Sequence, residues 1–301
     1  MSDASGEHGD FFELVSSLSQ RQRESHKGDF GRVLVVGGAR GMIGAPALAA
    51  NAALRGGAGL VTIAAPEPVQ LSVATLCLCA TSIPLSCRPD GTLGPSAIRQ
   101  VLDPAEESDV LAVGPGMGVS AGAAGVVRAV LEQDAPVVLD ADGLNNLLSI
   151  DHWREIRRCP IVLTPHPGEL ARLTGASPAD IQADRERAAM DAAGDWLEPA
   201  QTDAPLVLVL KGAGTVVTDG EIVYVNDTGN PGMATGGTGD VLTGLIAALI
   251  AQGLSLWDAA CLGAHIHGLA GDLAVEDLGE MSLTALDVVD YIPDALGQAI
   301  E

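Results

Sequence analysis

Short apolar runs alternate with longer Ala-rich segments along most of this chain. The runs are rich in Val, Leu and Ile and lack polar alternation, which is typical of strands buried on both faces of a parallel sheet. The Ala-rich segments have the length and composition of helices. The pattern therefore predicts an α/β fold in which helices cover both faces of a mostly parallel sheet.

Predicted strands and helices largely alternate along the chain, and the chain has no internal repeat. Strands are expected at residues 32–36, 60–64, 110–113, 136–139, 161–163, 206–210, 214–218 and 221–225. Helices are expected at residues 45–55, 121–132, 152–157, 168–173, 180–196, 240–252, 256–274 and 283–295. Asp219-Gly220, between the last two strands, predicts a hairpin. Residues 1–26 are expected to be a leading helix or tail without chemistry, and residues 27–301 a single domain.

A Gly-rich segment, residues 230–240 (Asn-Pro-Gly-Met-Ala-Thr-Gly-Gly-Thr-Gly-Asp), precedes the apolar helix near the C-terminus. Its glycines permit backbone conformations in which several N–H groups point at one anion, and the helix adds its positive end. Asp240 would then place a carboxylate beside a bound phosphate. Either it is a general base that takes a proton from a substrate hydroxyl, or it merely favours the first helical turn.

The segment resembles the signature of the NAD(P)H-hydrate dehydratases, a branch of the ribokinase-like superfamily. Further motifs, from Lys27-Gly28-Asp29-Phe30-Gly31 to His265-Ile266-His267-Gly268, extend the resemblance over nearly everything after residue 26. It implies a ribokinase-like three-layer αβα sandwich that repairs the (6S) hydrates of NADH and NADPH. The C6 hydroxyl would be phosphorylated and phosphate eliminated, with Mg²⁺ and with ADP or ATP as donor, ADP giving AMP and phosphate. The family also suggests a homotetramer.

The resemblance assigns roles to particular residues, with the metal ligands left unknown. Asp240 is the expected catalytic base. The expected substrate contacts are Ala45, Gly116, His166 and Asp240. Nucleotide binding is expected from Lys211, Gly212, Ala213, Gly214, Thr215 and Gly239. The expected anion hole consists of Gly236, Gly237, Thr238 and Gly239.

These motifs follow the carboxyl ends of predicted strands, where ligands of open α/β sheets bind. The Gly-rich loop at residues 37–46 lacks the spacing of a Rossmann dinucleotide fingerprint. Lys211 is one of only two lysines and ends a buried strand, where it could neutralise a phosphate. Two prolines stiffen the loop that presents His166 at the rim. Glu169 matches a family carboxylate linked to the metal–nucleotide region.

Two further pairs of polar residues have open roles. Asp140 and Asp142 follow a predicted strand, and either could orient the magnesium–phosphate assembly through water or only cap the next helix. His265 and His267 lie two residues apart in a predicted helix, so they point to different faces. We interpret the two histidines as structural.

The formal net charge is −23, from 16 basic and 39 acidic residues. Such a surface disfavours nucleic acid and anionic membranes as partners. Because no segment is typical of a signal peptide or a membrane span, a cytoplasmic location is expected. Five cysteines are expected to be reduced, with Cys77 and Cys79 alternating in a strand, and their spacing to Cys87 does not suit zinc.

Two other functions are compatible with a phosphate-binding α/β protein. A small-molecule kinase, such as a hydroxymethylpyrimidine or hydroxyethylthiazole kinase, would stop at the phosphate ester, and the complete signature argues against it. A catalytically silent nucleotide sensor would not need Asp240. Many relatives are fused to an epimerase for the hydrate epimers. Because 26 leading residues are too few for such a domain, a separate protein is expected to do that reaction.

Overall fold

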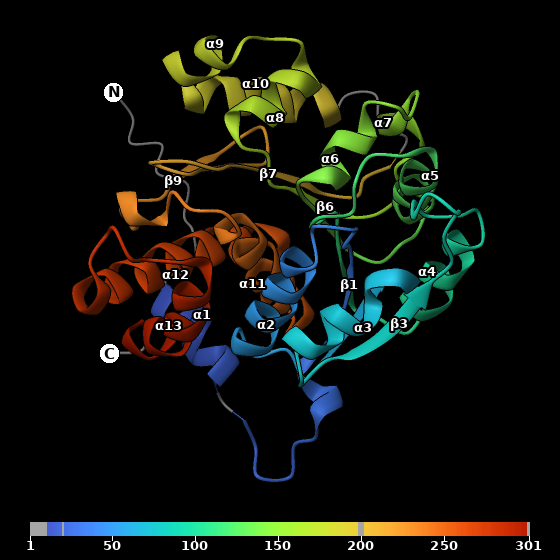
Figure 1. The fold of residues 1–301 in the computed structure, drawn as a ribbon. Coiled ribbons are helices and arrows are strands. Elements are labelled where there is room, and N and C mark those ends of the chain that lie inside the picture. Colours follow the sequence, from blue (N-terminus) through green and yellow to red (C-terminus); the bar gives the residue numbers. More distant parts are fainter. Residues whose placement is uncertain (1–10, 20, 198–201, 300–301) are drawn as a thin grey trace.

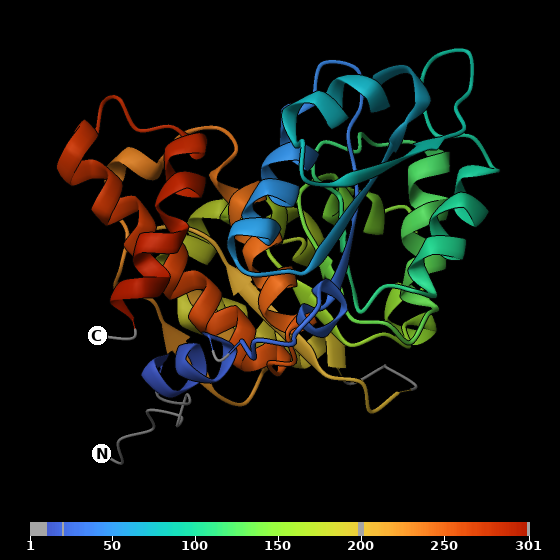
Figure 2. The same ribbon diagram turned by 90° about the horizontal axis from the view of Figure 1, so that it is seen from below.

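One nine-stranded sheet with helices on both faces makes up the structure (Figures 1 and 2). This computed structural model describes residues 11–19, 21–197 and 202–299. The strand order is β3-β2-β1-β4-β5-β6-β7-β8-β9, and β8 pairs antiparallel with both of its neighbours, whereas the other pairs are parallel. The bounds are β1 Arg32–Val36, β2 Leu60–Pro66, β3 Thr81–Leu85, β4 Val110–Val113, β5 Val137–Leu139, β6 Ile161–Leu163, β7 Leu206–Leu210, β8 Val216–Thr218 and β9 Val223–Val225.

The helices form the two outer layers. One face is covered by α1–α3 and α11–α13, and the other by α4–α10. Their bounds are α1 Phe11–Ser19, α2 Gly44–Arg55, α3 Glu67–Leu76, α4 Ala97–Ala105, α5 Ala121–Leu131, α6 Asp142–Leu147, α7 Trp153–Ile156, α8 Pro167–Thr174, α9 Pro178–Ala183, α10 Arg185–Leu197, α11 Thr238–Ala251, α12 Leu256–Leu278 and α13 Ala285–Gln298. Short 3-10 turns lie at η1 Lys27–Phe30 and η2 Pro231–Met233. The predicted three-layer α/β sandwich is confirmed.

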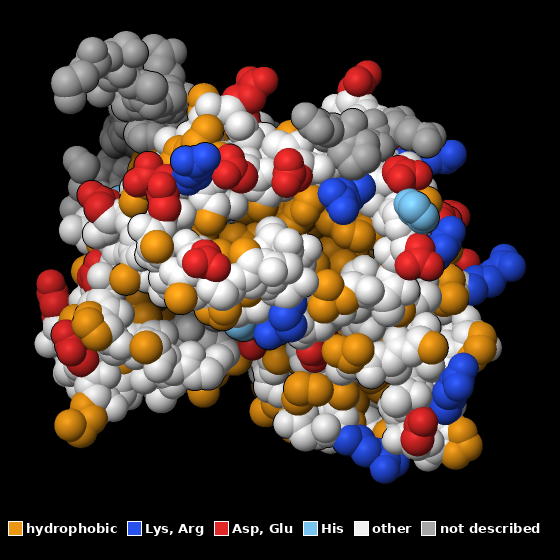
Figure 3. Space-filling view, turned by 90° about the horizontal axis from the view of Figure 1, so that it is seen from above, with side chains coloured by type: hydrophobic (Ala, Val, Ile, Leu, Met, Phe, Trp, Pro, Cys, Tyr) orange, Lys and Arg blue, Asp and Glu red, His pale blue; other side chains and the backbone are white. Residues whose placement is uncertain are grey.

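Acidic side chains are scattered over the face seen in Figure 3, separated by hydrophobic and uncharged areas, and Lys and Arg side chains lie between them. Within the described residues, no helix combines the length and the apolar character that crossing a membrane requires.

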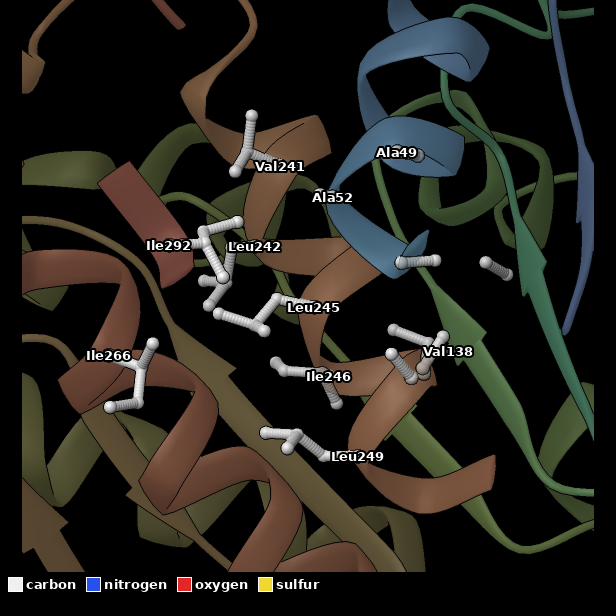
Figure 4. Close-up of a cluster of buried hydrophobic side chains, with 14 of the residues drawn as sticks. Ala49, Ala52, Val138, Val241, Leu242, Leu245, Ile246, Leu249, Ile266 and Ile292 are labelled. Atoms are coloured by element: carbon white, nitrogen blue, oxygen red, sulfur yellow. The ribbon is translucent and has the colours of Figure 1, made fainter. Parts of the chain in front are cut away.

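Helix α11 is deeply buried, because every residue from 241 to 250 is buried. Its Leu245 and Ile246 pack among side chains of α2, α12, α13 and β5 (Figure 4). Gly244 lets α2 approach closely, since a Cβ there would lie 1.9 Å from the carbonyl oxygen of Ala49. Burial of a large aliphatic side chain contributes about 1.5–3 kcal/mol, so this packing fixes where the first turn of α11 lies.

The sheet has its switch point at β1, which pairs with β2 on one side and β4 on the other. The chain leaves β1 for α2 on one face and leaves β4 for α5 on the opposite face. Connections that diverge in this way open a crevice at the carboxyl edge of an α/β sheet. The loops that follow β1 and β4 meet at this edge of the sheet, where they are joined by a main-chain hydrogen bond between Gly38 and Pro115.

Several elements differ from the prediction. The edge strand β3 and helices α3 and α4 were not predicted, because β3 carries polar and proline residues and α4 contains Pro104. The expected helix at 180–196 is two helices, α9 and α10, which break at Asp184, where φ is −151°. The predicted hairpin is confirmed as β8–β9.

The cysteine prediction is partly wrong. Cys77 is the residue that ends α3, and Cys79 lies in the turn that follows, so the two do not alternate in a strand. All five cysteines are free thiols, and Cys77, Cys159 and Cys261 are buried. Burial raises the pKa of the Cys159 thiol to about 12, which keeps it protonated and unreactive.

The predicted leading helix corresponds to α1, while residues 1–10 and 20 of the leading segment lie outside the described residues. Val15 of α1 is 2% exposed and belongs to the core that α11 and α12 share. The ring of Phe11 lies 4.8 Å from the ring of His265 on α12. Helix α1 is therefore packed against the hydrophobic core, and the division at residue 26 stays a prediction.

Candidate active site

The loops after β1 and β4 pack against each other at the crevice. The main-chain N–H of Gly38 donates to the carbonyl oxygen of Pro115 at 2.9 Å. Gly116 has φ +60°, and a Cβ there would lie 2.8 Å from the carbonyl oxygen of Met42 and 3.1 Å from the Cβ of Ala45. The structure thus brings together Ala45 and Gly116, two of the predicted substrate contacts.

The Gly-rich loop leads directly into α11. Gly237 precedes the helix with φ +100°, a conformation that L side chains rarely adopt. Thr238 begins the helix, and its hydroxyl donates to the carbonyl oxygens of Met233 and Thr235 at 3.1 Å each. Within the described chain, the main-chain N–H groups of residues 236–239 have no protein acceptor. They form the anion-binding geometry expected at the start of a helix.

His267 supports this loop from α12. Its Nε2 donates to the carbonyl oxygen of Thr238 at 2.9 Å, and burial lowers the pKa of the imidazole to about 4. The ring is therefore neutral at physiological pH. His265 instead stacks on Phe11, so the two histidines do point to different neighbours, as predicted.

Lys211, at the end of β7, lies among carboxylates. Its Nζ is 2.5 Å from Oδ1 of Asp140 and 4.0 Å from Oε2 of Glu169. Burial disfavours the charge of Lys211, but these two carboxylates outweigh burial and raise its pKa. A Cβ on Gly239 would lie 3.2 Å from Nζ, which places the ammonium group beside the first turn of α11. Lys211 and Gly239, both predicted to bind nucleotide, are neighbours.

Neither Asp140 nor Asp142 caps the helix that follows. Asp140 is 1% exposed, and its second carboxylate oxygen accepts a hydrogen bond from the Thr243 hydroxyl at 2.7 Å. Asp142 accepts from the main-chain N–H of Gly118 at 2.8 Å and so fixes the loop after β4. The capping residue of α6 is Ala141, which has no side-chain donor or acceptor. The capping alternative is therefore wrong for both carboxylates.

Asp240 lies in the first turn of α11, within the field of this cluster. Burial raises the pKa of Asp240 to about 7, and the negative charge of Asp140 adds to the rise, whereas Lys211 opposes it. Asp142 and Glu169 also raise the pKa, so all three carboxylates lie close enough to act on Asp240. A carboxylate with a pKa near neutrality is suited to take a proton at physiological pH.

His166 caps α8 and is half-exposed at the rim. Its Nδ1 accepts hydrogen bonds from the main-chain N–H of Gly168 at 3.0 Å and of Glu169 at 3.3 Å. In return, Oε2 of Glu169 accepts from the main-chain N–H of His166 at 2.8 Å. Because Nδ1 accepts, Nε2 of the neutral ring carries the proton, and it lies 3.5 Å from Oε1 of Glu169. The reciprocal cap also holds the Glu169 carboxylate toward Lys211.

A family profile for NAD(P)H-hydrate dehydratase matches residues 33–294. The chain belongs to the NAD(P)H-hydrate dehydratase family. Among curated relatives, the bifunctional NAD(P)H-hydrate repair enzyme Nnr of Moorella thermoacetica is 46% identical over 286 residues, covering 93% of this chain and 52% of that protein. The chain spans about half the length of the curated relatives it matches.

Two solved structures share the fold of this member of the dehydratase family. The ADP/ATP-dependent NAD(P)H-hydrate dehydratase from Bacillus subtilis, co-crystallized with ATP/Mg²⁺, is 28% identical with a TM-score of 0.78, covering 96% of this chain and 97% of that chain. A ribokinase-like superfamily protein from Enterococcus faecalis has a TM-score of 0.76 at 24% identity, covering 96% and 94%. The expected ribokinase-like fold is confirmed.

Sequence reasoning did not single out Arg185 of α10, which lies beside the predicted nucleotide loop of this family member. Its guanidinium donates to the carbonyl oxygens of Leu210 at 2.9 Å and Gly214 at 3.3 Å. A Cβ on Gly212 would lie 3.1 Å from that guanidinium, so the loop and the arginine pack together. The residue lies in an ordinary surface helix pattern, and no local motif marks it.

The residues present suit Mg²⁺ that arrives with a nucleotide better than a metal held by the protein alone. In the described part of the chain, no group of three or more His, Cys, Asp or Glu side chains is placed to hold a metal ion. Asp140 and Glu169 are instead paired with Lys211. Mg²⁺ commonly takes one or two carboxylates together with phosphate oxygens and water, a mode that Asp142 and Glu169 can serve.

Proposed function

We propose that this chain catalyses the nucleotide-dependent dehydration of the (6S) hydrates of NADH and NADPH. The observation that carries the proposal is Asp240, a carboxylate with a pKa near 7 in the first turn of α11, directly after the free N–H groups of residues 236–239. A base and an anion site at one helix start suit transfer of a phosphoryl group to a hydroxyl.

The chemistry explains why a kinase-like site is needed. Hydroxide is a poor leaving group from C6 of the hydrated nicotinamide ring, whereas phosphate leaves readily. Asp240 takes the hydroxyl proton, the oxygen attacks the terminal phosphorus in line, and the nucleotide departs. Loss of phosphate and a ring proton then restores the dihydronicotinamide. The main-chain N–H groups of residues 236–239 stabilise the charge on the transferring group.

The other site residues divide between two ligands. Lys211 and the loop at residues 212–215 bind the nucleotide, with Gly239 completing the subsite, while Ala45, Gly116 and His166 contact the hydrated nicotinamide half. Glu169 and Asp142 are the carboxylates available to hold Mg²⁺ with the phosphates, where the ion would neutralise phosphate charge. ADP as donor, giving AMP and phosphate, is supported by the family resemblance, and the ADP/ATP dependence of the Bacillus subtilis relative supports both donors.

We also propose a homotetramer, which the family resemblance suggests, and a cytoplasmic location. The net charge of −23 makes nucleic acid and anionic membranes poor partners. Sedimentation velocity at several protein concentrations measures the assembly directly.

One assay tests the function. Purified protein is incubated with (6S)-NADH hydrate, Mg²⁺ and either ADP or ATP, while absorbance of the dihydronicotinamide and the nucleotide products are followed. We expect absorbance to recover with one AMP from ADP, or one ADP from ATP, per ring restored. Consumption of nucleotide with a stable phosphate ester would instead show a small-molecule kinase, and binding without turnover would show a nucleotide sensor.

A further inference from the structure

Thr243 has the only polar side chain among residues 241–250, all of which are buried. A threonine in a helix ordinarily donates to the carbonyl oxygen four residues earlier. Here that oxygen, of Gly239, is 3.2 Å from the hydroxyl, whereas Oδ2 of Asp140 is 2.7 Å away. The hydroxyl has one hydrogen, and the shorter, charge-assisted bond takes it.

This bond closes a chain of contacts around the anion site. Thr243 on α11 holds Asp140 after β5, and Asp140 holds Lys211 after β7. The ammonium group of Lys211 in turn lies beside Gly239, at the first turn of the same helix. Asp140 is 1% exposed and Thr243 is fully buried, so neither side chain can reach solvent for another partner.

We propose that Thr243, acting through Asp140, is a positioning residue that sets where the Lys211 ammonium group meets nucleotide phosphate. The carboxylate has two oxygens and two partners, one on each. With the Thr243 hydroxyl on Oδ2, the carboxylate plane is fixed and Oδ1 faces Lys211. Without that donor the carboxylate can turn, and Lys211 has a second acceptor in Glu169, 4.0 Å away.

The inference rests on the proposed function for its choice of ligand, and nucleotide binding tests it without turnover. Calorimetric titration with ADP and Mg²⁺ is compared for the wild type, Thr243→Val and Thr243→Ser, with NADH as a second ligand. We expect Thr243→Val to weaken ADP binding about tenfold, the loss of one charge-assisted bond. Thr243→Ser should bind ADP within twofold of the wild type, and NADH binding should not change in either variant.

Thr218→Val is the matched control, because Thr218 is equally buried and lies at the opposite edge of the sheet, where its hydroxyl donates to the carbonyl oxygen of Ile222. If Thr243→Val does not fold, Thr243→Ala carries the same comparison with Thr243→Ser. Unchanged ADP affinity in the Val or Ala variant overturns the proposal. Equal weakening of ADP binding in Thr243→Ser or in Thr218→Val, or equal weakening of NADH binding, would also overturn it. Each of these results would attribute the loss of affinity to side-chain packing and not to the Thr243 hydroxyl. Absence of dehydration by the wild type would refute the proposed function and leave this binding comparison intact.

Discussion

At Asp240 two effects oppose each other. The start of a helix favours a carboxylate by the helix dipole, typically by about 0.3–1 kcal/mol. Burial and the charge of Asp140 disfavour ionisation more strongly, because the pKa rises to about 7 from an ordinary value of 3.8. A residue needed only to begin the helix would not be placed among three other carboxylates, so the balance favours the general-base hypothesis.

Asp240→Asn keeps the shape of the side chain and removes its basicity. We expect the rate of dehydration to fall by about 10²–10⁴, the usual contribution of a general base. ADP affinity should hold or improve, because a negative charge beside the phosphates is lost. Single-turnover dehydration and calorimetric ADP binding measure the two effects separately. Normal turnover by the variant would mean that Asp240 only starts the helix.

The raised pKa of Asp240 also predicts a pH dependence. Below about pH 7 the carboxylate is protonated and cannot accept the hydroxyl proton, so kcat/KM should fall as the pH drops through 7 and level off above it. Stability has the opposite sign, because a carboxyl whose folded pKa exceeds its unfolded value destabilises the fold once ionised. Asp240→Asn should therefore raise Tm at pH 8, and the gain should shrink between pH 7 and pH 4. A gain that is independent of pH would contradict the assignment.

Lys211→Ala removes the cation that we assign to the nucleotide phosphates. ADP binding should weaken by more than NADH binding. Stability should also fall, because the buried Asp140 loses its ion pair, a change that typically costs about 3–5 kcal/mol. Lys27→Ala is the control, because Lys27 is the only other lysine of the sequence and its side chain is exposed. Equal losses of affinity for ADP and NADH in the folded variant would reassign Lys211 to a purely structural role.

At the scale of elements, continuous apolar runs were the reliable signal. The strands β1, β4, β6 and β7 have the predicted bounds, because each is buried on both faces and flanked by Gly, Pro or polar residues. Strand β3 lies at the sheet edge, so its Thr81 and Ser82 break that pattern. Helix α4 buries one side only and contains Pro104, which masks its period. In both cases the missing information was the position of the element in the tertiary structure, which the local sequence does not give.

The first turn of α11 depends on the backbone of Gly237. At φ +100° an Ala is strained, by about 1–3 kcal/mol, and its Cβ would lie 2.5 Å from Leu48 and 3.1 Å from Ala285. Gly237→Ala should lower Tm and weaken ADP binding. Gly194→Ala in α10, away from the anion site, is the control, since no atom outside its own helical neighbours lies within 4 Å of its Cβ position. Equal tolerance of both substitutions would show that the loop conformation does not depend on Gly237.

At the scale of the whole molecule, the resemblance predicted which segments meet but not how their charges pair. Asp140 and Lys211 directly follow β5 and β7, and Glu169 lies in the helix after β6, so their proximity follows from the adjacency of these three strands. The direct contact of Lys211 with Asp140, which skips the intervening strand, depends on side-chain reach that no local pattern encodes. The same holds for the hydrogen bond from His267 on α12 to Thr238 and for the one from Thr243 on α11 to Asp140.

The net charge of −23 should make stability depend on salt. Described ion pairs such as Arg99–Asp103 and Arg187–Asp191 are mostly exposed and contribute little, so they do not offset the repulsion among 39 acidic residues. Added salt shortens the Debye length to about 10 Å at 0.1 M, which screens repulsion between distant carboxylates. We therefore expect Tm, measured by calorimetry at constant pH, to rise by several degrees between 10 mM and 500 mM KCl.

NaCl should give the same rise, because screening depends on ionic strength and not on the cation. A flat or falling Tm would mean that self-repulsion does not limit stability, and a rise with KCl alone would indicate a specific potassium site instead.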